Sequence, residues 1–129
     1  MNSTHTIEQV MVVLESYFDG LYHADSNILA PLFHSDARYV NTVAGDYMNY
    51  SMSEYLSTVK ERKSPASLAQ SRCDNVISIE IDGESMCFAK LSMMMLGREY
   101  LDYLTLIFSD GRWQIVSKVF SYKAIKGGL

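Results

Sequence analysis

The sequence is poor in the residues that build specialised scaffolds and sites. Its 129 residues include two cysteines, two prolines, three histidines and one tryptophan. Two cysteines cannot supply the dense disulfide framework of a small secreted domain. The histidines, cysteines and carboxylates have no spacing typical of a metal site, and there is no glycine-rich phosphate loop. We therefore expect no bound metal and no cofactor.

Basic charge and long apolar runs are also scarce. The formal net charge is -4, and the basic cluster Lys60, Arg62 and Lys63 is typical of the last turn of a helix. Nucleic-acid binding needs a concentrated basic face, so we expect no nucleic-acid partner. No apolar run is long enough to cross a bilayer, and the residues from Met1 to Thr6 lack the layout of a signal peptide. We therefore expect no membrane association and a cytoplasmic location.

What the chain does contain is an ordinary globular composition, with 48% apolar and 20% charged residues. Apolar side chains recur at helical spacing over residues 6–23. A second, short helix is expected after Asp25, which is suited to capping its start. A third is expected over about 52–63, opened by the pair Ser51 and Glu54 in the spacing of a capping box.

From residue 70 onward the pattern changes to the alternation typical of strands. The dipeptides Asp82-Gly83 and Asp110-Gly111 are strong hairpin signals. The sequence thus predicts a single domain over residues 1–129, of α+β class, with three N-terminal helices packed on a curved, mostly antiparallel β-sheet. The expected strands are 38–43, 47–50, 71–81, 85–96, 99–109 and 112–123.

The last hairpin predicts which side chains share a face. If Asp110-Gly111 is a two-residue loop, Ser109 lies opposite Arg112 and Asp102 lies opposite Val119. One face then becomes polar away from the turn, as a cavity-lining face does; it carries Tyr100, Asp102, Leu104, Leu106, Phe108, Trp113, Ile115, Ser117, Val119 and Ser121. The same rule at the other hairpin places Ile79 opposite Met86, unless a β-bulge shifts the register.

The opposite face is unusually aromatic for a surface in contact with solvent. Such a patch often marks a subunit contact. We therefore expect a homodimer through this outer face of the sheet, with an ordinary patterned surface as the alternative. Lys118 shares this face with the expected contact residues, which are Leu101, Tyr103, Ile107, Val116, Phe120 and Tyr122.

Three segments carry a resemblance to a known superfamily. They are Ser16-Tyr17-Phe18-Asp19-Gly20-Leu21, Leu32-Phe33-His34-Ser35-Asp36-Ala37, and Asp102-Tyr103-Leu104-Thr105-Leu106 running into Asp110-Gly111-Arg112-Trp113-Gln114-Ile115-Val116. Over nearly its whole length the chain resembles the nuclear-transport-factor-2-like (cystatin-like) superfamily, within it the "putative lumazine-binding" and SnoaL-like proteins. The resemblance implies a cone-shaped barrel. It implies no single chemistry, because this fold hosts enzymes, binding modules and transport adaptors.

A more distant likeness is to ketosteroid isomerases. In that alignment Tyr17 and Asp102 fall where those enzymes keep the two donors to the developing oxyanion, and Asn41 falls near the position of their proton-shuttling carboxylate. An amide cannot remove a proton. The likeness therefore implies a donor pair without its base, and we do not expect steroid isomerisation by that route. A carboxyl in an apolar pocket can still remain protonated and donate beside a tyrosine.

The leading prediction is a protein that binds a small apolar or aromatic molecule in an apolar pocket between helices and sheet. The expected lining residues are Tyr17, Phe33, Tyr39, Asn41, Tyr55, Met93, Tyr100, Asp102, Trp113 and Ser117. One alternative is an isomerase, cyclase or dehydratase acting on a polyketide- or steroid-like carbonyl compound, with Tyr17 and Asp102 as donors and His34 as base. Another is a ligand-free dimeric interaction module.

Each candidate residue also has a purely structural interpretation. Tyr17 lies on a buried helical stripe and could fill core. Asp102 could form a salt bridge with Lys118 or Arg38, and His34 could cap the second helix. An open pocket within reach of Tyr17 and Asp102 would favour a ligand. A filled interior with Asp102 paired to a basic residue would argue against both ligand hypotheses, the binder and the enzyme, and favour the interaction module.

Overall fold

A computed structural model describes residues 3–125 of the chain. The elements are three helices, one 3-10 turn and a six-stranded sheet, so the α+β prediction is confirmed. The predicted domain limits of 1–129 include residues 1–2 and 126–129, which lie outside the described residues. In chain order the elements are α1 (Ser3–Tyr22), α2 (Ser26–Leu29), η1 (Ala30–Leu32), β1 (Phe33–Asn41), β2 (Met48–Tyr50), α3 (Met52–Glu61), β3 (Cys73–Asp82), β4 (Met86–Met95), β5 (Arg98–Ser109) and β6 (Arg112–Ala124).

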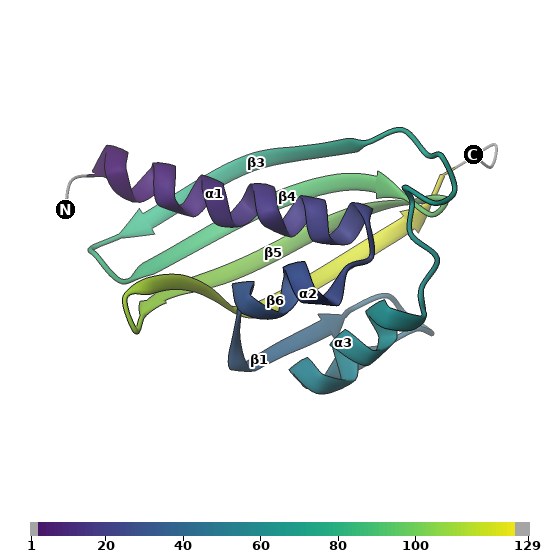
Figure 1. Ribbon diagram of the computed structural model, residues 1–129, viewed down its shortest axis with the longest axis horizontal. Coiled ribbons are helices and arrows are strands. Elements are labelled where there is room, and N and C mark those ends of the chain that lie inside the picture. The colour runs from purple at the N-terminus through teal and green to yellow at the C-terminus, as the bar shows by residue number, and fades with distance from the viewer. Residues whose placement is uncertain (1–2, 126–129) are drawn as a thin grey trace.

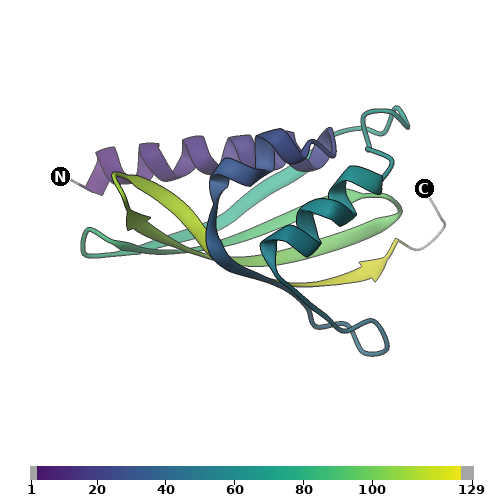
Figure 2. The same ribbon diagram turned by 60° about the horizontal axis from the view of Figure 1, so that its bottom comes forward.

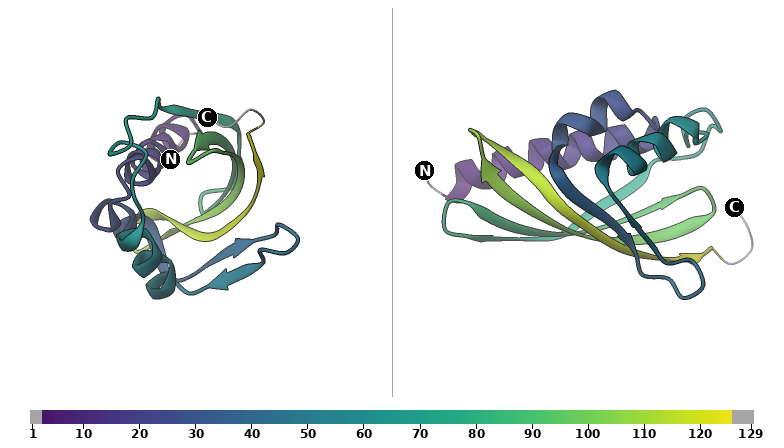
Figure 3. Two further views of the ribbon diagram at one scale, coloured as in Figure 1. Left: turned by 90° about the vertical axis from the view of Figure 1, so that its right-hand side faces the viewer. Right: turned by 90° about the horizontal axis from the view of Figure 1, so that it is seen from below.

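The strands form one sheet in the order β2-β1-β6-β5-β4-β3. Every neighbouring pair is antiparallel except β1 and β6, which run parallel. Figure 1 shows α1 lying across the long strands, and the end-on view of Figure 3 shows the sheet curling around one side of the molecule. The helices cover the concave side, here called the inner face, and Figure 2 shows the β1–β2 hairpin projecting away from them.

The helices form where the apolar spacing and the caps predict them. In α1 the buried stripe includes Leu14, Tyr17 and Leu21. At Gly20 an added Cβ would lie 2.6 Å from the Leu29 side chain, so the glycine lets α1 and α2 approach closely. Asp25 caps α2, and the capping box predicted at the start of α3 is present. None of the helices among the described residues is both long and apolar enough to cross a membrane.

The β5–β6 hairpin begins as predicted and then departs from the predicted register. Asp110 and Gly111 both have positive φ, as a two-residue hairpin loop with a right-handed strand twist requires. Ser109 pairs with Arg112, and the pairing continues to Leu106 opposite Ile115. The next pair is Thr105 with Ser117, so one residue of β6, Val116, is extra. This is a β-bulge.

The bulge reverses the predicted faces of the rest of β6, because side chains alternate along a strand. Asp102 lies opposite Phe120 instead of Val119. The outer-face placement of Lys118, Phe120 and Tyr122 is therefore wrong: they share the inner face with Asp102. Of these, Lys118 and Phe120 are buried. For the same reason the prediction that Ser117 lines the interior is wrong.

Two other local predictions are corrected. The β3–β4 loop has three residues, so Asp82 pairs with Met86, and Ile79 lies opposite Ala89. In addition, β1 begins at Phe33, because the 3-10 turn ends at Leu32. His34 is therefore a strand residue and not a helix cap.

Candidate functional site

A buried ion pair lies on the inner face of the sheet. Lys118 Nζ on β6 is 3.7 Å from Asp102 Oδ2 on β5, and their side chains are 6% and 1% exposed. The Tyr17 hydroxyl of α1 donates a hydrogen bond to the same carboxylate oxygen. The salt-bridge interpretation of Asp102 is thus confirmed, with Lys118 as its partner. Burying two charges is costly unless they pair well, so this arrangement depends on the contacts around it.

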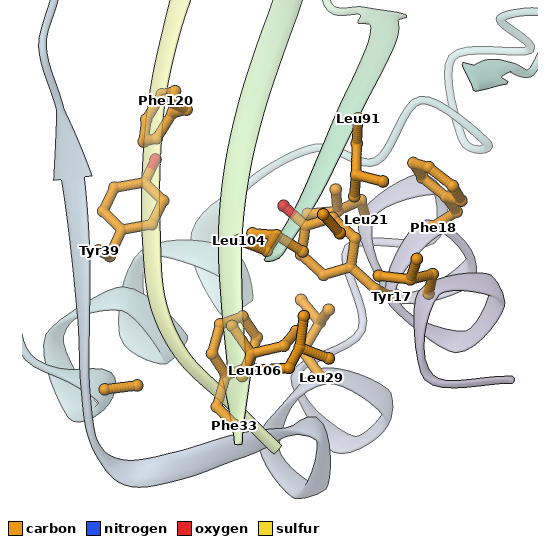
Figure 4. Packing of buried hydrophobic residues seen from close by; sticks show 14 of the residues in the cluster. Tyr17, Phe18, Leu21, Leu29, Phe33, Tyr39, Leu91, Leu104, Leu106 and Phe120 are labelled. Atoms are coloured by element: carbon orange, nitrogen blue, oxygen red, sulfur yellow. The ribbon is translucent and has the colours of Figure 1, made fainter. Parts of the chain in front are cut away.

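Aromatic rings surround the lysine. Lys118 Nζ lies 5.1, 5.2, 5.3 and 5.2 Å from the ring centroids of Tyr17, Tyr39, Tyr55 and Phe120. These distances are within the range of cation–π attraction. We call these five residues with Asp102 the Lys118 cluster. In Figure 4, Tyr17 points from α1 toward Leu104 on the sheet, and Tyr39 of β1 lies against Phe120 of β6.

The rings also pack on one another. Tyr39 stacks on Tyr55 with centroids 4.3 Å apart, and its ring lies 4.8 Å from Phe120. Phe33 extends the group, 6.3 Å from the Tyr17 ring and 5.8 Å from the Tyr55 ring. The parallel β1–β6 pairing brings Tyr39 beside Lys118. Strand pairing and the α1 and α3 stripes thus together assemble the cluster.

The tyrosines of the cluster are held in their neutral form. Burial raises the pKa of Tyr17 well above its ordinary value, and the Asp102 charge raises it further. Burial likewise raises the pKa values of Tyr55 and Tyr39, although the Lys118 charge lowers that of Tyr39 in part. A tyrosine that stays protonated can donate a hydrogen bond but cannot act as a base.

Two polar atoms of the cluster are buried without a hydrogen-bond partner among residues 3–125. They are the Tyr55 hydroxyl and Asp102 Oδ1. Both residues lie beside Lys118: Asp102 forms the ion pair with it, and the Tyr55 ring centroid is 5.3 Å from its Nζ. Because nearly all buried polar groups in folded proteins are paired, such atoms call for an explanation, and an unfilled binding role is one.

Five of the predicted site residues come together, and others do not. Tyr17, Phe33, Tyr39, Tyr55 and Asp102 form or adjoin the cluster. Tyr100 and Met93 are paired on β5 and β4 toward the other end of the inner face, where the Tyr100 ring lies 6.0 Å from Phe120.

Asn41 ends β1 and is committed to the loop that follows. Its Nδ2 donates to Asp46 at 3.0 Å, and its Oδ1 accepts from the Val43 backbone at 3.0 Å. The Tyr122 hydroxyl donates to the same Asp46 carboxylate. Asn41 therefore anchors this loop at the edge of the inner face.

Trp113, His34 and Ser117 lie apart from the cluster. Trp113 packs edge-on against Phe108 near the β5–β6 turn. Its Nε1 donates to Gln9 at 3.3 Å. His34 Nδ1 accepts from the backbone of Asp36, so its predicted role as a base beside Tyr17 and Asp102 has no geometric support. Ser117 lies on the outer face.

The interior around the cluster is filled by its own side chains. Among residues 3–125, five of the hollows have volumes of about 340 to 470 Å³. None of these five is lined by Tyr17, Tyr55, Asp102 or Lys118. The expected open pocket is therefore not seen at this point. Within the described part of the chain, no three His, Cys, Asp or Glu side chains are grouped as metal ligands would be.

Sequence reasoning missed Lys118 as a site residue. A signal for it was present, because Lys118, Phe120 and Tyr122 alternate along one strand. Two large aromatics on one face favour burial of that face, and Lys118, which precedes them on the same face, is then buried with them.

The comparisons with known proteins agree with this architecture. A family model described as "Putative lumazine-binding" matches residues 5–121. Among the curated proteins, none matches.

Solved structures also resemble the chain. An NTF2-like protein of unknown function from Shewanella baltica OS155 superposes with a TM-score of 0.86 at 20% identity, covering 97% of this chain and 99% of that one. One from Methylobacillus flagellatus KT gives 0.81 at 22% identity, covering 95% and 96%. A ketosteroid isomerase-like protein from Erwinia carotovora atroseptica SCRI1043 gives 0.71 at 10% identity, covering 92% and 96%. At these identities the likenesses establish only that the chain has the fold of these NTF2-like proteins. The family match goes further: the chain belongs to the "putative lumazine-binding" family.

Proposed function

We propose that the protein binds a small, largely apolar molecule at the Lys118 cluster, between the inner face of the sheet and the helices. The observation that carries the proposal is the pair of buried atoms that have no hydrogen-bond partner among residues 3–125, the Tyr55 hydroxyl and Asp102 Oδ1. A ligand that pairs with them would remove the free-energy cost of leaving them unsatisfied, about 1–3 kcal/mol for each group.

The unpaired atoms indicate the chemistry of the ligand. Asp102 Oδ1, as a carboxylate oxygen, accepts a hydrogen bond, and the Tyr55 hydroxyl donates one or accepts one. The surrounding rings favour a planar molecule that stacks. A planar heterocycle with a donor and an acceptor on one edge meets these demands. Because Tyr39 and Tyr55 are stacked at 4.3 Å, their rings must separate or shift to admit it.

A thermal-shift screen tests this proposal. The family description supports probing pteridines and flavins, and the ketosteroid isomerase-like fold supports adding steroids and aromatic polyketides. A ligand that binds only the folded state raises the melting temperature. We expect a hit whose shift is reduced by Tyr55→Phe and by Asp102→Asn. Tyr103→Phe, on the opposite face, is the matched control and should leave the shift unchanged.

Two results would contradict binding at this site. One is a screen in which no compound class stabilises the wild type. The other is a hit whose shift is the same in wild type, Tyr55→Phe and Asp102→Asn, because that ligand would sit elsewhere, for instance in the cavity of about 400 Å³ beside Trp113.

A second candidate function is a dimeric interaction module, and the filled interior favours it. On the outer face, Tyr103 is 39% exposed and is flanked by Leu101 and Phe88, whose ring lies 5.6 Å away. We propose a homodimer through this patch. Val116 is the bulged residue at its margin, and Phe120 and Tyr122 no longer belong to it.

Light scattering coupled to gel filtration tests the dimer. Tyr103→Asp should convert a dimer to a monomer, because a buried unpaired charge disrupts an apolar interface. Tyr47→Asp is the matched control, since Tyr47 is 68% exposed in the β1–β2 loop. A wild type that is monomeric at high concentration would contradict the proposal.

A further inference from the structure

The β-bulge in β6 has a chemical consequence. Without the extra residue Val116, Lys118 would lie on the outer face. With it, a primary amine is turned into an interior lined by rings, where its side chain is 6% exposed. Bulges re-aim side chains and are over-represented beside active sites. The neighbouring carboxylate stands at 3.7 Å, longer than a hydrogen bond, so the amine is close to Asp102 without being tightly bonded to it.

We propose that Lys118 forms an imine with a carbonyl-bearing ligand. The proposal rests on the proposed function, because it uses the same cluster, and it names the ligand class as an aromatic aldehyde or ketone. Lysines in desolvated, ring-lined pockets are the ones that serve as amine nucleophiles toward carbonyl groups. The two unpaired polar atoms supply a proton acceptor, Asp102 Oδ1, and a hydrogen-bond donor to the carbonyl oxygen, the Tyr55 hydroxyl.

The steps balance without any further reactant. Lys118 Nζ passes one proton to Asp102, and its lone pair then forms a bond to the carbonyl carbon. The nitrogen then carries a positive charge, and it passes a proton to the carbonyl oxygen, which becomes the hydroxyl of a carbinolamine. The proton held by Asp102 leaves with that hydroxyl as one water, which restores the carboxylate and leaves a protonated C=N bond between ligand and lysine. The net change is an amine and a carbonyl giving an imine and water, with no oxidation or reduction.

Each group of the cluster has a place in this sequence. Tyr17 donates to Asp102 Oδ2 and so fixes the carboxylate, which leaves Oδ1 free to accept a proton. The Tyr55 hydroxyl is a neutral donor with no partner in the described part of the chain, and it is suited to the carbonyl oxygen. Tyr39 and Phe120 flank the lysine on the strand side and exclude water.

Lys90 provides a matched control in the same molecule. It is on β4, its Nζ lies 5.5 Å from the Tyr103 ring, and its strand neighbours place it on the outer face. Both lysines therefore have a tyrosine ring at similar distance. Of the two lysines, Lys118 is the one that is also buried and paired with a carboxylate, that of Asp102.

Reductive trapping tests the proposal. The folded protein is incubated with benzaldehyde and cyanoborohydride, which reduces an imine to a stable secondary amine, and the modified lysines are located by peptide mass spectrometry. We expect the adduct on Lys118 to form at least about ten-fold faster than on Lys90, a difference worth about 1.4 kcal/mol in the barrier. Labelling spread over the exposed lysines, with Lys118 unmodified, would overturn the inference.

Variants separate this inference from simple binding. Lys118→Arg keeps the charge but should abolish the adduct, whereas Lys90→Arg should leave it unchanged. Asp102→Asn and Tyr55→Phe should each slow it, with near-ultraviolet circular dichroism confirming that the variants are folded. If a compound from the thermal-shift screen stabilises the protein at this cluster and no Lys118 adduct forms, the imine is wrong and binding stands. If nothing stabilises the protein but Lys118 is trapped selectively, the imine stands and the non-covalent binding proposal fails.

Discussion

The two faces of the sheet hold the same kinds of residue in different environments. On the inner face, Lys118 is buried, paired with Asp102 and surrounded by rings. On the outer face, Lys90 lies over Tyr103, a tyrosine that is 39% exposed. The lysines occupy neighbouring parts of one sheet, and their residue type does not distinguish them. What distinguishes them is which side of the strand they are on, and for Lys118 a single extra residue decides that.

The largest expected difference between the faces is the effect of removing each amine. Lys118→Met leaves the Asp102 charge buried without its partner, which costs about 3–5 kcal/mol in the free energy of unfolding. Lys90→Met should change it by less than about 0.5 kcal/mol, as is usual for surface substitutions. Urea denaturation of the two variants at neutral pH checks this. Equal losses would mean that Lys118 is not desolvated as described.

The pair Lys118→Met with Asp102→Asn refines that result. The double variant removes both charges, so it should recover part of the stability lost in Lys118→Met alone. If the losses of the two single variants simply add, the lysine and the carboxylate do not interact.

A smaller difference is expected between two tyrosines of the cluster. Tyr17→Phe removes a hydrogen bond to a carboxylate and should cost about 1.5–3 kcal/mol. Tyr55→Phe removes a buried hydroxyl that has no partner among the described residues, and should be neutral or slightly stabilising. Tyr103→Phe on the outer face should also be close to neutral. A large loss in Tyr55→Phe would show that its hydroxyl is bonded in solution.

The pH dependence of the free energy of unfolding tests the burial of the tyrosines on the inner face. Burial raises the pKa of Tyr17, Tyr39 and Tyr55 in the folded state above their unfolded values. Their neutral forms are therefore favoured by folding, and this contribution is complete below about pH 10, the unfolded tyrosine value. As the pH rises above it, the unfolded state loses these protons first and stability falls. We expect steep alkaline unfolding, less steep in Tyr17→Phe.

Absorbance at the tyrosinate band gives the matching observation. The three tyrosines of the cluster should ionise only as the protein unfolds, because burial raises their pKa values. If they ionise near their ordinary pKa while the protein is still folded, the interior is open to water.

Much of the fold could be predicted because it depends on local signals. Asp25, the Ser51–Glu54 capping box and Asp110-Gly111 satisfy nearby backbone groups or allow positive φ, so their sequence neighbours suffice to place them. The candidate site was predicted only in part. Tyr17 and Asp102 were singled out together, and they do meet. Lys118 was missed because the faces of β6 were assigned by counting alternate residues from the turn. One extra residue, Val116, reverses that assignment for every residue after it.

The sequence alone determined the class of the protein, the order of its helices and strands, and the family resemblance, because apolar periodicity, caps and turn residues act over a few positions. Only the tertiary structure decided where β6 bulges, that Phe120 and Lys118 point inward, and that the ion pair sits among rings. The physical reason is that a bulge is selected by how two strands fit each other and the helices above them. That fit depends on residues far apart in the chain, such as Tyr17 and Asp102.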